Sequence, residues 1–327
     1  MTDAVRFLPP EWAPQSALWC GWPRLADEWG GDFDGARSDI AAFVRAAAAF
    51  VPVKLAAGSD EAAQSARAAV GDLAEIVEVP TGDIWLRDTG PIITQGEGGH
   101  QAETFRFNGW GGKYLMPGDT ETAAAVAGIE GIRVRAHDIV LEGGAIDVDG
   151  EGRLLTTRQC LLNPNRNGDW TESDAEAALA KAFGVSEVIW LGDGLLNDHT
   201  DGHVDNIARF IAPGHVLCQH PTGPGDPNAE ILLAIEDSLR SAGLMVTTIS
   251  SPGHVHFGDG QPVPASHMNF TITNGAVLVP TYDERFSLVA LAELGPLFPG
   301  RKIIGLPALN ILRGGGSFHC MTREIPA

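Results

Sequence analysis

The chain has 327 residues, 44% of them apolar, and is long enough to bury a large core. Its 42 Asp and Glu residues against 22 Lys and Arg give a formal net charge of -20, which argues against nucleic acid and anionic membranes as partners and fits a cationic substrate. No apolar run approaches the roughly 18 residues of a membrane-spanning helix and no signal peptide is evident at the N-terminus, so we expect a cytoplasmic protein.

The first predicted elements alternate short apolar strands with Ala-rich amphipathic helices. The pattern predicts strands over residues 17–22, 53–57 and 75–79 and helices over residues 38–50 and 60–70. We interpret this region as one copy of a module that the rest of the chain repeats.

From residue 91 onward, a module recurs four times: a hairpin with a Gly-containing turn, a polar loop, a helix and a short strand. The predicted hairpins cover residues 91–107, 145–157, 207–218 and 269–281. The predicted helices cover residues 119–127, 171–183, 228–242 and 284–294, and the strands after them cover residues 133–140, 187–191, 245–249 and 302–306.

Five strand-rich modules of similar size can close into a ring around a central cavity. The chain has no Gly/Ser-rich or charged linker, so we predict a single α/β domain over residues 1–327. The candidate catalytic residues described below are expected to follow the ends of strands that meet at the centre. A Rossmann-like fold is the alternative.

Four cysteines are widely separated and form no Cys-x-x-Cys pair, which argues against a disulfide scaffold or a zinc ribbon. Cys20, Cys160 and Cys218 lie in apolar, strand-like runs and are expected to be buried. Cys320 instead follows three glycines, Gly314–Gly316, where backbone can approach a ligand closely. Cys320 is therefore the candidate nucleophile, with an inert buried thiol as the alternative.

A nucleophilic thiol needs a histidine and a carboxylate nearby, and His203 and Asp205 supply them. Asp88 adds a second carboxylate. Two carboxylates that face one pocket repel each other unless a cation lies between them, and a planar guanidinium suits both. Cys320 would then attack the central carbon, while His203 protonates the departing nitrogen and later activates a water molecule. This pattern indicates deimination, which needs no metal or other cofactor because the guanidinium is already charged.

Trp85 and Trp110 are predicted to wall the pocket and stack on the substrate, with core packing as the alternative. Gly316 is expected to contact the substrate where a side chain would collide.

Three further residues flank these motifs. Arg87 is expected to orient Asp88 from within the carboxylate-rich pocket. Glu142 precedes glycines of a tight turn, and its binding to a backbone or substrate amine is the alternative. His319 is expected to point away from the site if its segment is extended.

A metal-dependent hydrolase is the first alternative function, because His199 and His203 are spaced like two metal ligands on one helix. Gly202 and the β-branched neighbours argue against a helix there. A guanidine-binding protein without catalysis is the second alternative.

The motifs together resemble the agmatine deiminase family, which belongs to the guanidine-modifying penteins and includes peptidyl-arginine deiminase-like proteins. The resemblance rests on motifs in one order along the chain: residues 9–14, 85–91, 107–112, 142–144, 156–163, 201–206 and 314–320. It implies a five-bladed α/β propeller and a cofactor-free site with Cys320 as nucleophile, His203 as acid and base, and Asp88 and Asp205 as guanidinium ligands. It also implies the hydrolysis of agmatine to N-carbamoylputrescine and ammonia in polyamine biosynthesis, and a homo-oligomer.

Two departures from the family bear on the substrate. Asp201 stands where family members usually carry Asn, and residues 251–266 form a shorter loop than in plant members. We expect loops near the pocket mouth to hold the amine end of the substrate. Another guanidine, such as peptidyl-arginine, is the alternative substrate.

Overall fold

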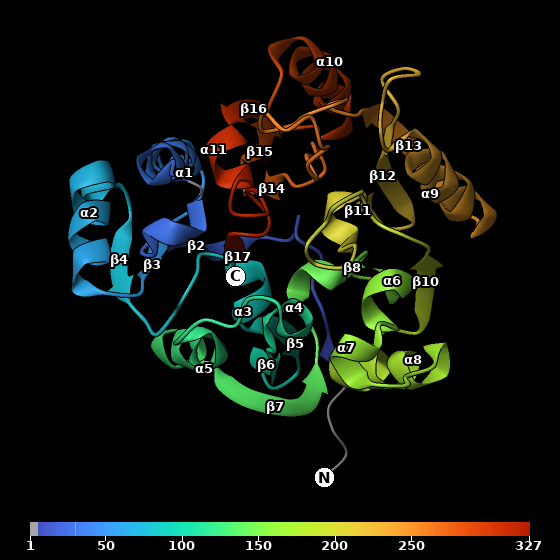
Figure 1. Ribbon diagram of the computed structural model, residues 1–327. Coiled ribbons are helices and arrows are strands. Elements are labelled where there is room, and N and C mark those ends of the chain that lie inside the picture. The colour runs from blue at the N-terminus through green and yellow to red at the C-terminus, as the bar shows by residue number, and fades with distance from the viewer. Residues whose placement is uncertain (1–5, 30) are drawn as a thin grey trace.

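The computed structural model describes residues 6–29 and 31–327. Within these residues, five small sheets surround a centre, and the long helices lie outside this ring (Figure 1). In each sheet one strand pairs antiparallel with a neighbour on one side and parallel with a neighbour on the other. The prediction of an α/β propeller built from five similar modules is confirmed.

The first sheet joins the two ends of the chain. Its strand order is β17-β2-β3-β4, and its elements are β2 (Gln15–Trp22), α1 (Phe33–Ala47), β3 (Val53–Ala57), α2 (Asp60–Val70), β4 (Glu75–Glu78) and β17 (Thr322–Pro326). β17 pairs antiparallel with β2, with Thr322 opposite Cys20. The antiparallel pair of this module is therefore made by strands from opposite ends of the chain, which periodicity within the N-terminal region did not predict.

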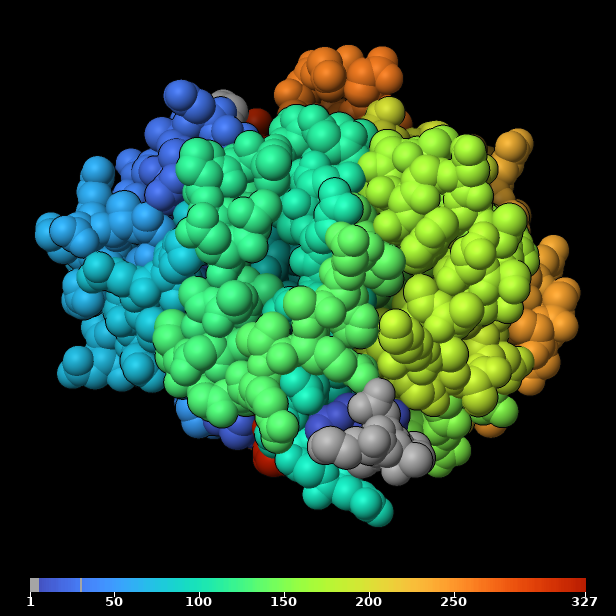
Figure 2. All heavy atoms as spheres, turned by 90° about the horizontal axis from the view of Figure 1, so that it is seen from below, coloured from blue at the N-terminus to red at the C-terminus, as the bar shows by residue number. Residues whose placement is uncertain are grey.

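The other four sheets follow in chain order. The second contains β1 (Arg6–Phe7), β5 (Ile92–Gly96), β6 (Gln101–Arg106), α5 (Asp119–Ile129) and β7 (Arg133–Val140), and the third β8 (Asp147–Val148), β9 (Arg153–Thr157), α8 (Glu172–Phe183) and β10 (Glu187–Leu191). The fourth contains β11 (Ala208–Ala212), β12 (His215–His220), α9 (Ala229–Ser241) and β13 (Met245–Ser250), and the fifth β14 (Thr271–Ile272), β15 (Ala276–Thr281), α10 (Glu284–Leu294) and β16 (Lys302–Pro307). All four predicted hairpins and the helices and strands after them are confirmed. In the view from below, the second and third modules, green to yellow-green, form one continuous surface (Figure 2).

The bounds of α1 differ from the predicted residues 38–50. The helix begins at Phe33, after an Asp32 that makes no side-chain cap, and it contains Gly35, so the start carries no clear sequence signal. It ends at Ala47, and residues 48–51 turn toward Pro52. Proline disfavours helical backbone in the residue before it, Val51, so Pro52 limits the helix but does not by itself set its end at Ala47.

The apolar core is divided among the modules. Five clusters of buried apolar residues occur among the described residues. In α1, Ile40, Phe43, Val44 and Ala47 are fully buried at helical spacing, and each large apolar side chain buried in this way contributes about 1.5–3 kcal/mol. No helix among the described residues is long and apolar enough to cross a membrane.

Short segments near the centre (Figure 1) come just before the first strand of each module. They include α3 (Leu86–Thr89), η3 (Gly143–Ala145) and η4 (Val204–Asn206). The short helices elsewhere in the described chain are η1 (Ala26–Trp29), η2 (Gly71–Leu73), α4 (Gly109–Gly112), α6 (Arg158–Leu161), α7 (Pro164–Asn167), η5 (Gly295–Leu297) and α11 (Leu309–Leu312). The candidate catalytic residues thus lie in the connections between the last strand of one module and the first strand of the next. They follow strand ends as expected, and each lies closer in sequence to the strand after it.

Candidate active site

A cavity of about 210 Å³ opens beside Cys320. The predicted residues Asp88, Trp85, Trp110 and Gly316 also line it. The other lining residues are Asp27, Glu28, Asp83, Tyr114, Met116, His199, Thr200, Arg313, Gly314 and Gly315. Five modules thus contribute to one site through the residues that precede their first strands: Asp88, Gly144, Asp205, Asn269 and Cys320.

Asp88 is fixed by two donors. Trp110 Nε1 donates to its Oδ2 at 2.9 Å, and the Gly144 backbone N–H donates to its Oδ1 at 2.9 Å. Trp110 has a φ of 52°, which a non-glycine residue rarely adopts, and the Asn108 side chain supports this turn by accepting from Gly111 N. The turn aims the indole N–H at the carboxylate, so the carboxylate is preorganised to bind a cation.

Asp205 lies on η4 and is fully buried. Its Oδ2 accepts from His319 Nδ1 at 2.8 Å, whereas its Oδ1 has no partner among the described residues. Burial, with a contribution from the Asp88 charge, raises the pKa of Asp205 to about 7. Desolvation of the buried carboxylate is therefore the main cause of the shift, and the neighbouring His203 opposes it.

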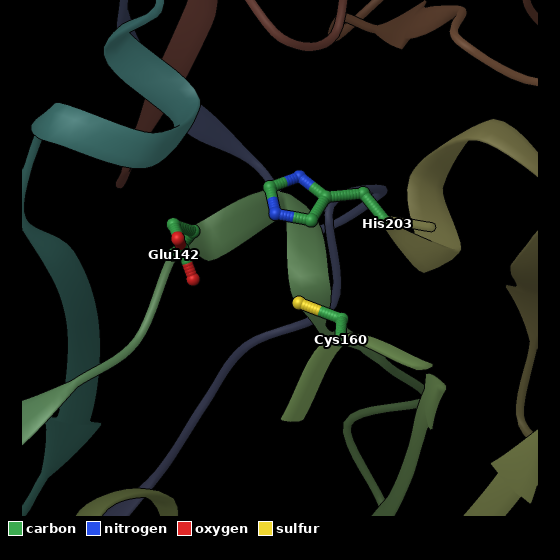
Figure 3. Close-up of side chains that lie close together, drawn as sticks. All are labelled: Glu142, Cys160 and His203. Carbon is green, nitrogen blue, oxygen red and sulfur yellow. The ribbon is translucent and has the colours of Figure 1, made fainter. Parts of the chain in front are cut away.

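His203 lies between acidic groups. Its Nδ1 is 3.8 Å from Asp88 Oδ1, and the side chains of Glu142 and Cys160 point toward its ring (Figure 3). Burial alone would lower the pKa of His203, but Asp88, Cys160 and Glu142 together raise it well above 6.5. These neighbours therefore favour the protonated imidazolium form of His203, which can donate a proton.

Cys320 is nearly buried, at 4% exposure. Asn269 Nδ2 lies 3.0 Å from its Sγ, and Asp205 Oδ2 lies 3.6 Å from it. The Asn269 Oδ1 also accepts from the backbone N–H groups of His319 and Cys320. Burial, followed by the charges of Asp205 and Asp88, raises the pKa of Cys320 well above its usual range, which favours the protonated thiol.

The glycine run makes room for aromatic rings. A side-chain carbon on Gly316 would lie 2.7 Å from the Trp85 ring, and one on Gly314 would lie 2.9 Å from Trp29. Gly315 has a φ of +102°, which other residues rarely adopt. The run therefore packs Trp85 against the segment that leads to Cys320.

The structure corrects two expectations about neighbouring residues. Residues 318–320 form a turn rather than an extended segment, so His319 contacts Asp205 instead of pointing away from the site. Arg87 Nη2 lies 2.8 Å from Glu324 Oε2, and its Nε donates to the His319 carbonyl. Arg87 therefore binds the C-terminal strand rather than orienting Asp88.

The loop of residues 251–266 does not line the reaction cavity. Phe257 and its neighbours instead line an adjoining hollow of about 560 Å³ that shares Tyr114 and His199 with the cavity. Acidic residues of the N-terminal module, Asp83 and Glu28, line the cavity instead.

The metal alternative required His199 and His203 to lie on one helix, and this arrangement is wrong. Residues 199–203 form turns, with a φ of 64° at Asp201 and 83° at Gly202. His199 stacks on Tyr114, whereas the potential ligands near His203 are Glu142 and Cys160.

Gly144→Ala is expected to damage the site. The added methyl group would lie 2.5 Å from His203 Nδ1 and 3.0 Å from Asp88 Oδ1. Displacement of these groups should lower kcat/KM by about 100-fold or more, measured per folded molecule, and overpacking of this buried position should also lower the melting temperature. Gly128→Ala in α5 is the control, because nothing lies within 4 Å of the added carbon. Equal activity of the two variants would show that Gly144 is not tightly enclosed by catalytic groups.

Comparison with known proteins gives matches over nearly the whole chain. The model of the Porphyromonas-type peptidyl-arginine deiminase family matches residues 7–326. The chain is 36% identical to an agmatine deiminase of Ectopseudomonas mendocina, covering 98% of this chain and 95% of the relative, and 37% identical to one of Stutzerimonas stutzeri with the same coverage.

Solved structures of agmatine deiminases also match this chain over nearly its whole length. An agmatine deiminase of Enterococcus faecalis superposes with a TM-score of 0.91 at 31% identity, covering 98% of this chain and 96% of that one. A variant of a C. jejuni agmatine deiminase with substrate bound superposes with a TM-score of 0.92 at 28% identity, covering 99% and 97%.

Proposed function

Because the chain belongs to the Porphyromonas-type peptidyl-arginine deiminase family, we propose that it hydrolyses agmatine to N-carbamoylputrescine and ammonia. The observation that carries this proposal is the gathering of one thiol, one imidazole and two carboxylates, of which Cys320 and Asp88 line the cavity while His203 and Asp205 lie against them. The reaction belongs to putrescine biosynthesis, a part of polyamine biosynthesis.

Asp88 and Asp205 form a clamp for the guanidinium group. Asp88 is held in place by Trp110 and Gly144, and the unpaired Oδ1 of Asp205 is free to accept from the substrate. A bound cation removes the repulsion between the carboxylates, which favours the charged form of Asp205.

Cys320 acts as the nucleophile once the cation is bound. As the cation binds, the thiol gives its proton to solvent water, and the thiolate Sγ forms a bond to the central guanidinium carbon. The carbon–nitrogen bond then breaks, and His203 gives its proton to the departing ammonia. A water molecule attacks the S-linked amidino intermediate, His203 takes up a proton from it, and the carbon–sulfur bond breaks to release N-carbamoylputrescine.

The pKa of the Cys320 thiol is expected to lie above its usual range in the ligand-free protein, because burial, and then the Asp205 and Asp88 charges, oppose a thiolate. Asp88→Asn removes one negative charge and should therefore lower the midpoint of ionisation by about one pH unit. Thiolate absorbance near 240 nm measures this midpoint, with Cys320→Ser as the background. An unchanged midpoint in Asp88→Asn would contradict the coupling between this carboxylate and the nucleophile.

The cavity favours agmatine over a peptide. Its volume is about 210 Å³, and Asp27, Glu28 and Asp83 supply carboxylates for a second positive charge. Burial raises the pKa of Asp83 to about 7, and a bound ammonium group would favour its charged form.

Comparison of kcat/KM for agmatine, arginine and an arginyl peptide tests this choice. We expect the highest value for agmatine, whereas a higher value for the peptide would assign the alternative substrate. The single domain over residues 1–327, the cytoplasmic location, the homo-oligomer and the lack of a nucleic-acid partner stay predictions.

A further inference from the structure

Arg166 lies in α7 and connects two segments on different sides of His203. Its side chain is fully buried. Nε donates to Glu142 Oε1 at 2.6 Å, Nη1 to Asp201 Oδ2 at 2.7 Å, and Nη2 to the Thr200 carbonyl at 2.9 Å. All three nitrogens are therefore engaged, and a planar fork of donors can satisfy these acceptors where a lysine cannot.

One acceptor, Glu142, is a neighbour of the His203 ring. Glu142 is fully buried, and its Oε2 has no partner among the described residues. A carboxylate oxygen of Glu142, the Cys160 thiol and a ring nitrogen of His203 all lie within 4.8 Å of one another (Figure 3). Arg166 thus holds one oxygen of Glu142 while the other remains available to the imidazole.

The other acceptors belong to the backbone segment that leads into His203. Thr200 Oγ1 accepts from the His203 backbone N–H at 3.0 Å. Asp201 has a φ of 64°, an uncommon backbone conformation for a residue with a side chain. Its carboxylate also binds Lys113 at 2.6 Å. Such a turn persists only when its surroundings hold it, and Arg166 supplies that support at both Asp201 and the Thr200 carbonyl, with Asn165 as a further donor to Asp201.

We propose that Arg166 is a positioning residue that fixes the Glu142 carboxylate beside His203 and, with the same guanidinium, the backbone turn that carries His203. This inference rests on the proposed function, since deimination is its readout. No role for Arg166 follows from the motifs of the sequence.

Loss of Arg166 is expected to lower the pKa of His203. The titratable groups that face His203 are Asp88, Glu142, Cys160, Asp205 and His319. Burial raises the pKa of Glu142, and Arg166 is the strongest influence that opposes this rise. Without Arg166, Glu142 would take up a proton more readily and lose its charge. His203 would then lose one of the charges that raise its pKa, so the alkaline limb of the pH–rate profile should move to lower pH.

The test compares the pH profiles of kcat for agmatine in wild type, Arg166→Met and Lys113→Met. Arg166→Met should lower kcat by about 10- to 100-fold and move the alkaline limb down by about one pH unit, with a smaller change in KM. Lys113→Met also removes a cation from Asp201 but leaves the Arg166–Glu142 pair intact, so its alkaline limb should coincide with that of the wild type. Arg166→Lys should not restore activity, because it lacks the fork of donors.

A second pair of variants covers the case in which Arg166→Met does not fold, since removal of one partner leaves an unpaired buried carboxylate. Arg166→Met combined with Glu142→Gln removes that carboxylate and should match Glu142→Gln alone in its alkaline limb. An unshifted limb in Arg166→Met, or different limbs in these two variants, would overturn the inference. Absence of wild-type activity on agmatine would instead overturn the proposed function.

Discussion

Cys320→Ser is expected to abolish ammonia release from agmatine while agmatine still binds. A hydroxyl is a much weaker nucleophile than a thiolate near neutral pH, and loss of a nucleophile lowers kcat by about 10⁴-fold or more. The clamp residues Asp88 and Asp205 remain in place, so isothermal titration calorimetry should still detect saturable binding of agmatine at one site per chain.

The matched control for Cys320→Ser is Cys218→Ser. Cys218 is also buried, but it lies in β12 and packs in the core cluster of the fourth module. This variant should lose some stability and keep its activity per folded molecule. Turnover by Cys320→Ser at a rate near the wild type would remove Cys320 from the mechanism.

Asp88→Ala is expected to lose substrate binding. The variant removes one carboxylate of the clamp and the acceptor of Trp110 Nε1 and Gly144 N–H. Loss of a buried, hydrogen-bonded charge from a charged pair costs about 2–5 kcal/mol, which corresponds to a dissociation constant roughly 30- to several thousand-fold higher. His203 also loses the strongest of the charges that raise its pKa, so turnover at saturating agmatine should fall as well.

Asp149→Ala controls for the loss of a buried aspartate. Asp149 is buried, but its carboxylate accepts from the backbone of its own hairpin turn at Glu151 and Arg153. We expect this variant to melt at a lower temperature and to bind agmatine normally. Normal binding by Asp88→Ala would show that the two-carboxylate clamp is wrong.

The modular plan of the fold could be predicted from the sequence because each module is local. The hairpin at residues 91–107 and the strand at residues 133–140 carry their own turn and alternation signals, and the structure contains them as β5, β6 and β7. The pairing of β17 with β2 could not be predicted in this way, because it joins residues about 300 positions apart. Closure of the ring is therefore a tertiary property without a local pattern.

The same distinction explains which site residues could be predicted. The catalytic roles of Cys320, His203, Asp88 and Asp205 could be predicted because their side-chain chemistry suggests roles before any contact is known. The roles of Asn269 and Arg166 could not, because they depend on which atoms lie beside these side chains in the fold.

Glu142 shows the limit of local reasoning, since its glycine-rich context indicates a turn, whereas its position is defined by Arg166 and His203. Arg87 shows the converse: adjacency to Asp88 in sequence suggested a contact, but the turn of α3 directs the guanidinium to Glu324.

The most direct test of the account is turnover of agmatine by the purified protein after treatment with EDTA, with ammonia and N-carbamoylputrescine both quantified. The mechanism predicts equal amounts of the two products at a rate that EDTA does not change, because the guanidinium supplies the positive charge itself. No product from agmatine, or activity that EDTA removes and a divalent metal restores, would contradict it.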